Sequence, residues 1–126
     1  MPLPAALIPS SKMIDRPAIR AYAEVTGDFN PIHLDPDFAA RTPMKGIIAH
    51  GMLSLNMLWQ ALAKTLGADA LARIDLDIRF IKPVRENDTV TGRGLRVADH
   101  ADTYDVWVEN QAGEKVIAGT ATLRPQ

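Results

Sequence analysis

An aspartate and a histidine, Asp28 and His33, stand five positions apart in a segment rich in turn-forming residues. Asn30 and Pro31 lie between them, and both residue types favour a bend with limited backbone freedom. On a regular helix these side chains would not face each other, whereas a bend lets the carboxylate and the imidazole converge. Both groups act as general acids and bases, so together they can hold a water molecule and move its protons. We therefore predict that Asp28 and His33 activate water.

A second segment offers backbone donors for an oxygen that becomes negatively charged. Gly51 and Met52 follow Ala49-His50 at the expected start of a long apolar helix, where amides have no partner within the helix. Aided by the helix dipole, their N–H groups can stabilise an enolate-like oxygen, and a glycine lets a carbonyl group approach closely. Water activation and oxyanion stabilisation are the two requirements for adding water to an enoyl thioester.

Composition and periodicity predict the elements on either side of these two segments. A short strand is expected within residues 3–13, and a helix over residues 18–25 starts at Asp15 and Pro17 and stops near Gly27. Residues 28–45 are expected to form a structured loop with one helical turn over residues 37–40. From about residue 50 to residue 66 most positions are apolar, and Gly67 suits the C-cap. Such an apolar helix must be enclosed by other elements.

The enclosing elements are expected to be strands. Residues 74–80 alternate apolar and charged side chains, a period of two that indicates a half-buried strand. Further strands are predicted at residues 89–98, 103–109 and 115–123, with turn-forming residues between them, so that they pair as antiparallel neighbours. The prediction is an α+β fold in one domain of residues 1–126, a curved antiparallel sheet wrapped around a central apolar helix. Because such a sheet exposes an edge strand, we expect a homodimer or a higher homo-oligomer.

Composition excludes several partners and several kinds of chemistry. The 126 residues carry a formal net charge of -1, so no basic field attracts nucleic acid or anionic lipid. Polar residues interrupt the apolar segment 46–66, and no membrane span is expected. The absence of cysteine removes disulfides, zinc-thiolate sites and thiol nucleophiles. With no secretory signal at the N-terminus, we expect a cytoplasmic protein.

Residues 22–39 resemble the signature of the (R)-specific enoyl-CoA hydratases, the MaoC-like dehydratases of the hotdog fold. The downstream segment His50-Gly51-Met52-Leu53 is similar to the start of the family's helix, and residues 79–84 are similar to its next strand. The positions that match the signature are Tyr22, Val25, Thr26, Gly27, Asp28, Asn30, Pro31, Ile32, His33 and Ala39.

This resemblance implies an enzyme of fatty acid metabolism that adds water reversibly, in the syn sense, to a trans-2-enoyl-CoA, giving the (R)-3-hydroxyacyl-CoA. Asp28 and His33 would be the catalytic pair that holds the water, the Gly51 amide would donate to the thioester carbonyl, and Asn30 would support the loop. No cofactor is implied, because coenzyme A arrives as part of the substrate. The family's double-length members carry two such units and this chain has one, which disfavours bulky acyl groups.

Three other functions remain open at this point. A 3-hydroxyacyl-acyl-carrier-protein dehydratase would use the same pair with a protein carrier, and a hetero-oligomeric hydratase would combine this chain with a related subunit. Thioester hydrolysis occurs in related hotdog proteins, although the Asp28 and His33 pair favours hydration.

Candidate contacts to the phosphates of coenzyme A are the dispersed basic residues Arg41, Lys45, Arg79, Lys82 and Arg85.

Some residues near the predicted site allow more than one interpretation. Ser54, one turn beyond His50, either lines the acyl pocket or is a buried hydroxyl bonded to the preceding turn. His50 itself is expected to be packed and hydrogen-bonded rather than catalytic. A metal site built from Asp28, His33, Asp35 and Asp37 is disfavoured, because the last two suit a helix start.

The other large side chains are expected to be structural. His100 is expected to be exposed in a turn, and four residues are expected in the core: Met52, Met57, Trp59 and Trp107.

Overall fold

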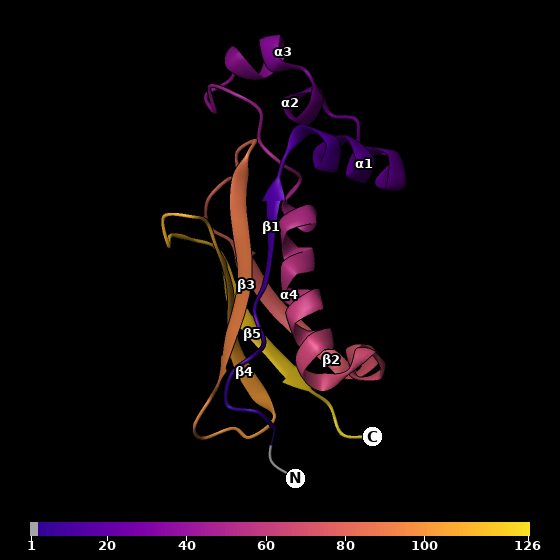
Figure 1. The fold of residues 1–126 in the computed structure, drawn as a ribbon, viewed down its shortest axis with the longest axis vertical. Coiled ribbons are helices and arrows are strands. Elements are labelled where there is room, and N and C mark those ends of the chain that lie inside the picture. The colour runs from indigo at the N-terminus through magenta and orange to yellow at the C-terminus, as the bar shows by residue number, and fades with distance from the viewer. Residues whose placement is uncertain (1–2) are drawn as a thin grey trace.

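A five-stranded antiparallel sheet curves around one long helix in the structure, a computed structural model that describes residues 3–126 (Figure 1). The strand order is β1-β3-β4-β5-β2, and all neighbouring strands run antiparallel. The α+β architecture and the antiparallel pairing of the last three strands are thereby confirmed. The strands are β1 Ser10–Ile14, β2 Ile74–Phe80, β3 Asp88–Arg96, β4 Thr103–Glu109 and β5 Lys115–Leu123.

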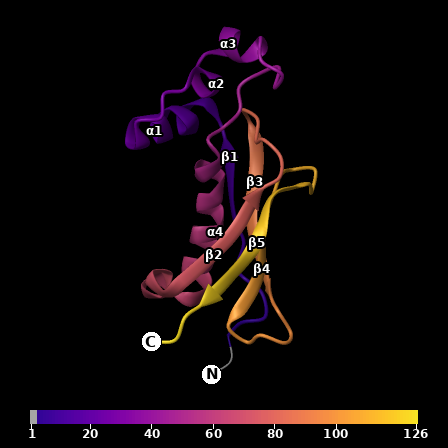
Figure 2. The ribbon, with the colours of Figure 1, turned by 180° about the vertical axis from the view of Figure 1, so that it is seen from behind.

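Helix α4, Gly51–Leu66, packs along the concave face of the sheet and forms the centre of the core (Figures 1 and 2). Leu58 and Leu62 on the helix and Val90 and Val108 on the sheet are fully buried in one hydrophobic cluster. At Gly92 the two elements are so close that a Cβ would lie 2.5 Å from the Met57 carbonyl oxygen. The apolar helix is thus enclosed as its sequence requires.

Three shorter helices lie together at the end of the molecule where α4 begins (Figures 1 and 2). Helix α1, Arg16–Thr26, is capped by Asp15, which accepts from the Ala18 amide, and ends at Gly27, whose φ of 75° is in the left-handed region. Helices α2, Pro31–Leu34, and α3, Pro36–Ala40, each begin with a proline. A 3-10 helix, η1, Ala68–Arg73, links α4 to β2.

The predicted bounds of β2, β4 and β5 coincide with the observed strands, and other elements differ. Only Ser10–Ile14 of the N-terminal segment is a strand, and β3 ends at Arg96 rather than residue 98. The predicted loop between residues 28 and 45 contains an additional helical turn, α2. The sequence gives no signal for this turn because four residues are too few to show a helical period, although Ile32 and Leu34 pack against the core.

Two of the residues predicted as core lie elsewhere. Met52 is 52% exposed, because it lies on the same face of α4 as the partly exposed Asn56 and Trp59, whereas Met57 is buried as expected. Trp107 alternates with the buried Val106 and Val108 and so lies on the outer face of β4, half-buried, with the Lys115 ammonium 4.9 Å from its ring centroid. Trp59 is half-buried against the core, and His100 is exposed.

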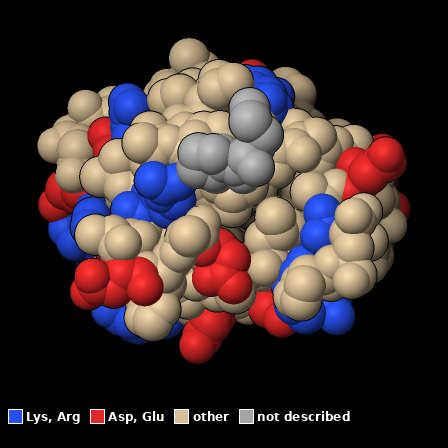
Figure 3. Space-filling view, turned by 90° about the horizontal axis from the view of Figure 1, so that it is seen from below, with Lys and Arg blue, Asp and Glu red and all other residues tan. Residues whose placement is uncertain are grey.

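Charges of both signs are intermixed at one end of the molecule. Figure 3 shows this at the end of the molecule opposite the three short helices, where basic and acidic side chains alternate. None of the helices within residues 3–126 is long and apolar enough to cross a membrane.

Candidate active site

Asp28 is held by hydrogen bonds to its backbone amide and to Oδ1, and no hydrogen bond to Oδ2 is found within residues 3–126. Its own amide donates to Thr26 Oγ1 over 3.3 Å, and its Oδ1 accepts from the Asn30 amide over 3.2 Å. This short-range turn directs the second oxygen, Oδ2, toward His33. The Asp28 side chain is 52% exposed, so these bonds rather than packing fix its orientation.

Asn30 organises the turn that brings His33 opposite Asp28. As the N-cap of α2, its side-chain oxygen accepts from the Ile32 amide over 3.1 Å, and its backbone carbonyl accepts from the His33 amide over 3.0 Å. Pro31 occupies the first helical position, where its missing N–H removes no bond. Asn30 is therefore a structural member of the site and is absent from the cavity lining described below.

The His33 ring is fixed in one orientation by its Nδ1 atom. Nδ1 lies 2.7 Å from the Ile48 carbonyl oxygen, which can only accept, so Nδ1 carries the hydrogen in this bond. In the neutral imidazole Nε2 then has a free lone pair, and this atom lies 4.0 Å from Asp28 Oδ2. The His33 side chain is only 12% exposed.

The gap between His33 Nε2 and Asp28 Oδ2 suits a bridging water. At 4.0 Å the two atoms are too far apart for a direct hydrogen bond. A water oxygen about 2.8 Å from both would see them at an angle of roughly 90°, which its two O–H groups span with little bending. Such a water donates both hydrogens to the pair and presents its oxygen lone pairs outward.

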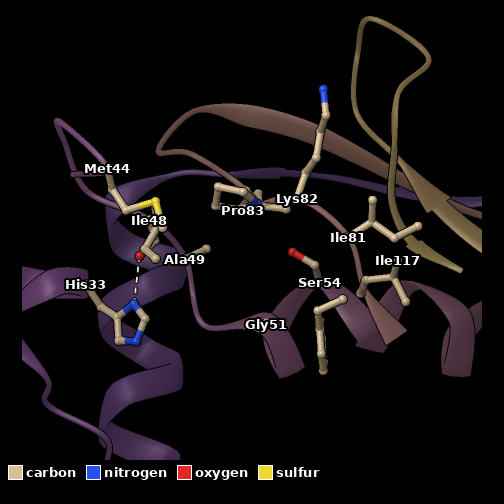
Figure 4. A pocket seen from close by; sticks show the side chains of 12 residues that line it. His33, Met44, Ile48, Ala49, Gly51, Ser54, Ile81, Lys82, Pro83 and Ile117 are labelled. Atoms are coloured by element: carbon tan, nitrogen blue, oxygen red, sulfur yellow. Dashed lines mark hydrogen bonds between the residues drawn. The ribbon is translucent and has the colours of Figure 1, made fainter. Parts of the chain in front are cut away.

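A mainly apolar cavity of about 340 Å³ lies beside His33. Gly51 and Ser54 of α4 form part of its wall, and Figure 4 shows the Ser54 hydroxyl pointing away from the helix into this space. The rest of the lining comes from Met44, Ile48, Ala49, Phe80, Ile81, Lys82, Pro83, Val84 and Ile117. Asp28 is not among the lining residues. Its link to the cavity is the gap between its Oδ2 and His33 Nε2, where a bridging water would lie.

The start of α4 lies at this cavity, and Gly51 forms part of its wall. Gly51 and Met52 are the first two helical residues, whose N–H groups have no acceptor within the helix. A Cβ on Gly51 would lie 2.8 Å from Phe80 Cε1, so in this structure an aromatic ring occupies the space that the sequence suggested for a carbonyl. Phe80 is 53% exposed, which leaves its ring room to rotate away from Gly51.

Ser54 Oγ is fully buried and has no hydrogen-bond partner among residues 3–126. Of its two interpretations, the hydroxyl bonded to the preceding turn is therefore wrong in this conformation. A buried hydroxyl without a partner costs free energy unless a ligand or a water satisfies it.

His50 contacts both members of the pair. Its Nε2 lies 3.0 Å from the Asp28 carbonyl oxygen, and its ring stacks on the His33 ring with centroids 3.9 Å apart. Its burial and hydrogen bond agree with the sequence interpretation, but the partners lie 17 and 22 positions away in the chain. No local pattern could identify them.

The carboxylates of the suggested metal set do not gather. Asp35 caps α3 through bonds from the Asp37 and Phe38 amides, and neither acidic residue joins Asp28. The donor atoms that lie within 4.8 Å of one another belong instead to Asp28, His33 and His50. The two imidazoles are stacked, so their nitrogens do not converge on one point as metal ligands must.

One of the candidate phosphate contacts lies at the cavity. Lys82 lines it and is paired with Glu114, and this ion pair lowers the pKa of the Glu114 carboxyl. Arg85 donates to the Met44 carbonyl oxygen. Arg79 faces a different groove, on the outer side of the sheet, and Arg41 and Lys45 are exposed.

Comparison with known proteins adds an independent line of evidence. Residues 7–120 match the family described as MaoC like domain. The chain is 30% identical over 118 residues to an (R)-specific enoyl-CoA hydratase of Aeromonas caviae, covering 90% of this chain and 88% of that protein. The solved structure of the (R)-hydratase from A. caviae involved in PHA biosynthesis has a TM-score of 0.83 and 27% identity, with 100% of this chain and 98% of that chain covered.

A second relative is longer than this chain. The 3-hydroxybutyryl-CoA dehydratase of Methylorubrum extorquens is 39% identical over 79 residues, which cover 63% of this chain. The matched part makes up 50% of that protein.

Proposed function

The chain belongs to the MaoC-like domain family and has its hotdog fold, and on this premise we propose that it is an enoyl-CoA hydratase. The reaction is the reversible addition of water to a trans-2-enoyl-CoA, which gives the (R)-3-hydroxyacyl-CoA. The observation that carries the proposal is the separation of 4.0 Å between Asp28 Oδ2 and His33 Nε2, beside a cavity large enough for an acyl group.

The first step uses the water held by Asp28 and His33. Its oxygen attacks the β-carbon, a C–O bond forms, and one O–H proton passes to the pair. The electrons of the double bond move toward the thioester oxygen. The same pair then returns a proton to the α-carbon, so one water has been added and no proton is gained or lost. Because both additions come from the side of the pair, the hydration is syn.

The second requirement is stabilisation of the thioester oxygen, which we assign to the start of α4. Gly51 lines the cavity, and its amide would be the main donor, while the Met52 amide adds to the positive end of the helix. The Ser54 hydroxyl, one turn further along, supplies an additional donor. Rotation of Phe80 away from Gly51 accompanies entry of the thioester.

The cavity volume favours a short acyl group. About 340 Å³ is near the lower end of the range of roughly 300 to 1,000 Å³ found for small-molecule pockets. Lys82 stands at this cavity and is the basic residue we propose to face the coenzyme A portion.

We further propose that two copies pair through an edge of the sheet. Strand β2 pairs with β5 on one side, and on its other side it has no partner strand within residues 3–126. The exposed apolar side chain of Ile81 follows the end of this strand, where a second copy would cover it. Light scattering of the purified chain tests this, and a monomer at micromolar concentration would contradict it.

Hydration of crotonyl-CoA by the purified chain tests the proposed function. We expect the enoyl absorbance to fall, with (R)-3-hydroxybutyryl-CoA as the product, and the rate to decrease as the acyl chain lengthens. Release of free thiol instead would show a thioesterase. Activity only with an acyl-carrier-protein substrate, or only after addition of a related subunit, would support the corresponding alternative.

A further inference from the structure

His50 is a buried titratable side chain that the mechanism above leaves without a role. It is 4% exposed and occupies the N-cap of α4. Serine, threonine, aspartate or asparagine at an N-cap stabilises a helix by accepting from its first amides. The His50 side chain makes no such bond. The His50 imidazole therefore does not cap helix α4.

Its first contact is with the backbone of Asp28. Nε2 lies 3.0 Å from the Asp28 carbonyl oxygen, and because a carbonyl only accepts, Nε2 carries the hydrogen and donates. No other hydrogen bond to this carbonyl is found within residues 3–126. The buried imidazole thus ties the exposed Asp28 to the start of the central helix.

Its second contact is with the ring of His33. The two imidazoles stack with centroids 3.9 Å apart and an interplanar angle of 27°, and the Tyr22 ring lies 5.0 Å away from His50 on a tilted plane. His33 is thus held by Ile48 at Nδ1 and by His50 along its face. The next residue after His50 is Gly51, which lines the cavity.

We propose that His50 is a positioning residue, which holds Asp28 Oδ2 and His33 Nε2 at the separation that one water bridges and aligns them with the Gly51 amide. The hydrogen bond to Asp28 is the essential contact, because the carboxylate has no packing of its own to keep it in place. The effect on catalysis rests on the proposed function, and the effect on the geometry of the turn does not. A displacement of about 1 Å at a reacting group can lower a rate by roughly a hundredfold.

Two substitutions at position 50 distinguish the hydrogen bond to Asp28 from the ring contact with His33. His50→Phe keeps an aromatic ring against His33 but removes the donor to Asp28, whereas His50→Gln places a donor near the position of Nε2 and removes the ring. We expect His50→Phe to lower kcat on crotonyl-CoA by about ten- to a hundredfold with little change in KM. His50→Gln should restore kcat to within about fivefold of the unchanged protein.

Equal kcat values in the two folded variants, whether high or low, would overturn the proposal. Amide hydrogen exchange gives a readout that does not depend on activity. In His50→Phe the amides of Asn30, Ile32 and His33 should exchange faster than in His50→Gln, with α4 amides unchanged. If the unchanged protein hydrates no enoyl-CoA, the proposed function fails while this comparison still decides the role of His50. Identical exchange at the three amides would then overturn it.

Discussion

The sheet with α4 and the three short helices beyond it are stabilised in different ways. The first region buries long runs of apolar side chains, such as Leu58 and Leu62 against Val90 and Val108. In the second region Ile19, Ala23 and Ala39 are the only buried residues of the three helices, and Asp28 and Asn30 are exposed. There the geometry depends on capping bonds and on contacts from Ile48 and His50. The sheet and α4 therefore carry most of the buried apolar side chains, whereas the proposed water-holding pair lies on the capped turns. Substitutions in the apolar core and in the pair should therefore separate stability from activity.

Asp28→Asn should separate activity from stability most sharply. The amide keeps the oxygen that accepts from Asn30 but cannot act as a base, so kcat on crotonyl-CoA should fall at least about a hundredfold. Because the side chain is exposed, the melting temperature should stay near that of the unchanged protein. Near-normal turnover would remove Asp28 from the mechanism.

The opposite result is expected for Leu58→Ala in α4. Truncation of this fully buried side chain should lower the free energy of unfolding by about 2 to 5 kcal/mol, as measured by urea denaturation. At a temperature where the variant is still folded, KM and kcat should change little. A large fall in kcat without loss of stability would mean that the core and the site are not separate.

Asn30→Ala tests whether the second region is held by its caps. Loss of the bond to the Ile32 amide should cost about 0.5 to 2 kcal/mol locally, which is enough to loosen α2 and lower kcat. Global unfolding should change less than for Leu58→Ala, since α2 contributes no buried residue. The measurement is kcat beside a urea midpoint, and full activity in Asn30→Ala would contradict the role of the cap.

The smallest effects are expected for Ser54 and Ser10, two buried serines whose hydroxyl groups differ in hydrogen bonding. Ser54→Ala should lower kcat/KM by roughly tenfold and leave stability unchanged or higher, because its hydroxyl is unpaired. Ser10→Ala is the matched control, since Ser10 donates to Gln60 over 2.7 Å. It should lose about 0.5 to 1.5 kcal/mol of stability and no activity. Unchanged kcat/KM in Ser54→Ala would confine Ser54 to the cavity wall.

The contrast between the regions also explains what could be predicted from the sequence. The bounds of β2 agree with its prediction, because alternation of apolar and charged residues is a local signal, and those of β4 and β5 agree because turn-forming residues bound them. The signature likewise marked Asp28 and His33. The helical turn α2, the exposed position of Met52 and the partners of His50 were not predictable in this way. Each depends on the packing of segments distant in sequence or on a turn too short to show a period.

A double-substitution cycle tests the central claim, that Asp28 and His33 hold a single water. The variants are Asp28→Asn, His33→Ala and the two combined, with kcat measured on crotonyl-CoA. Each single change should cost about a hundredfold or more, and the combination should cost little more than either alone, because removing one group already releases the water. Losses that multiply to roughly ten-thousandfold would show independent roles and contradict a shared water.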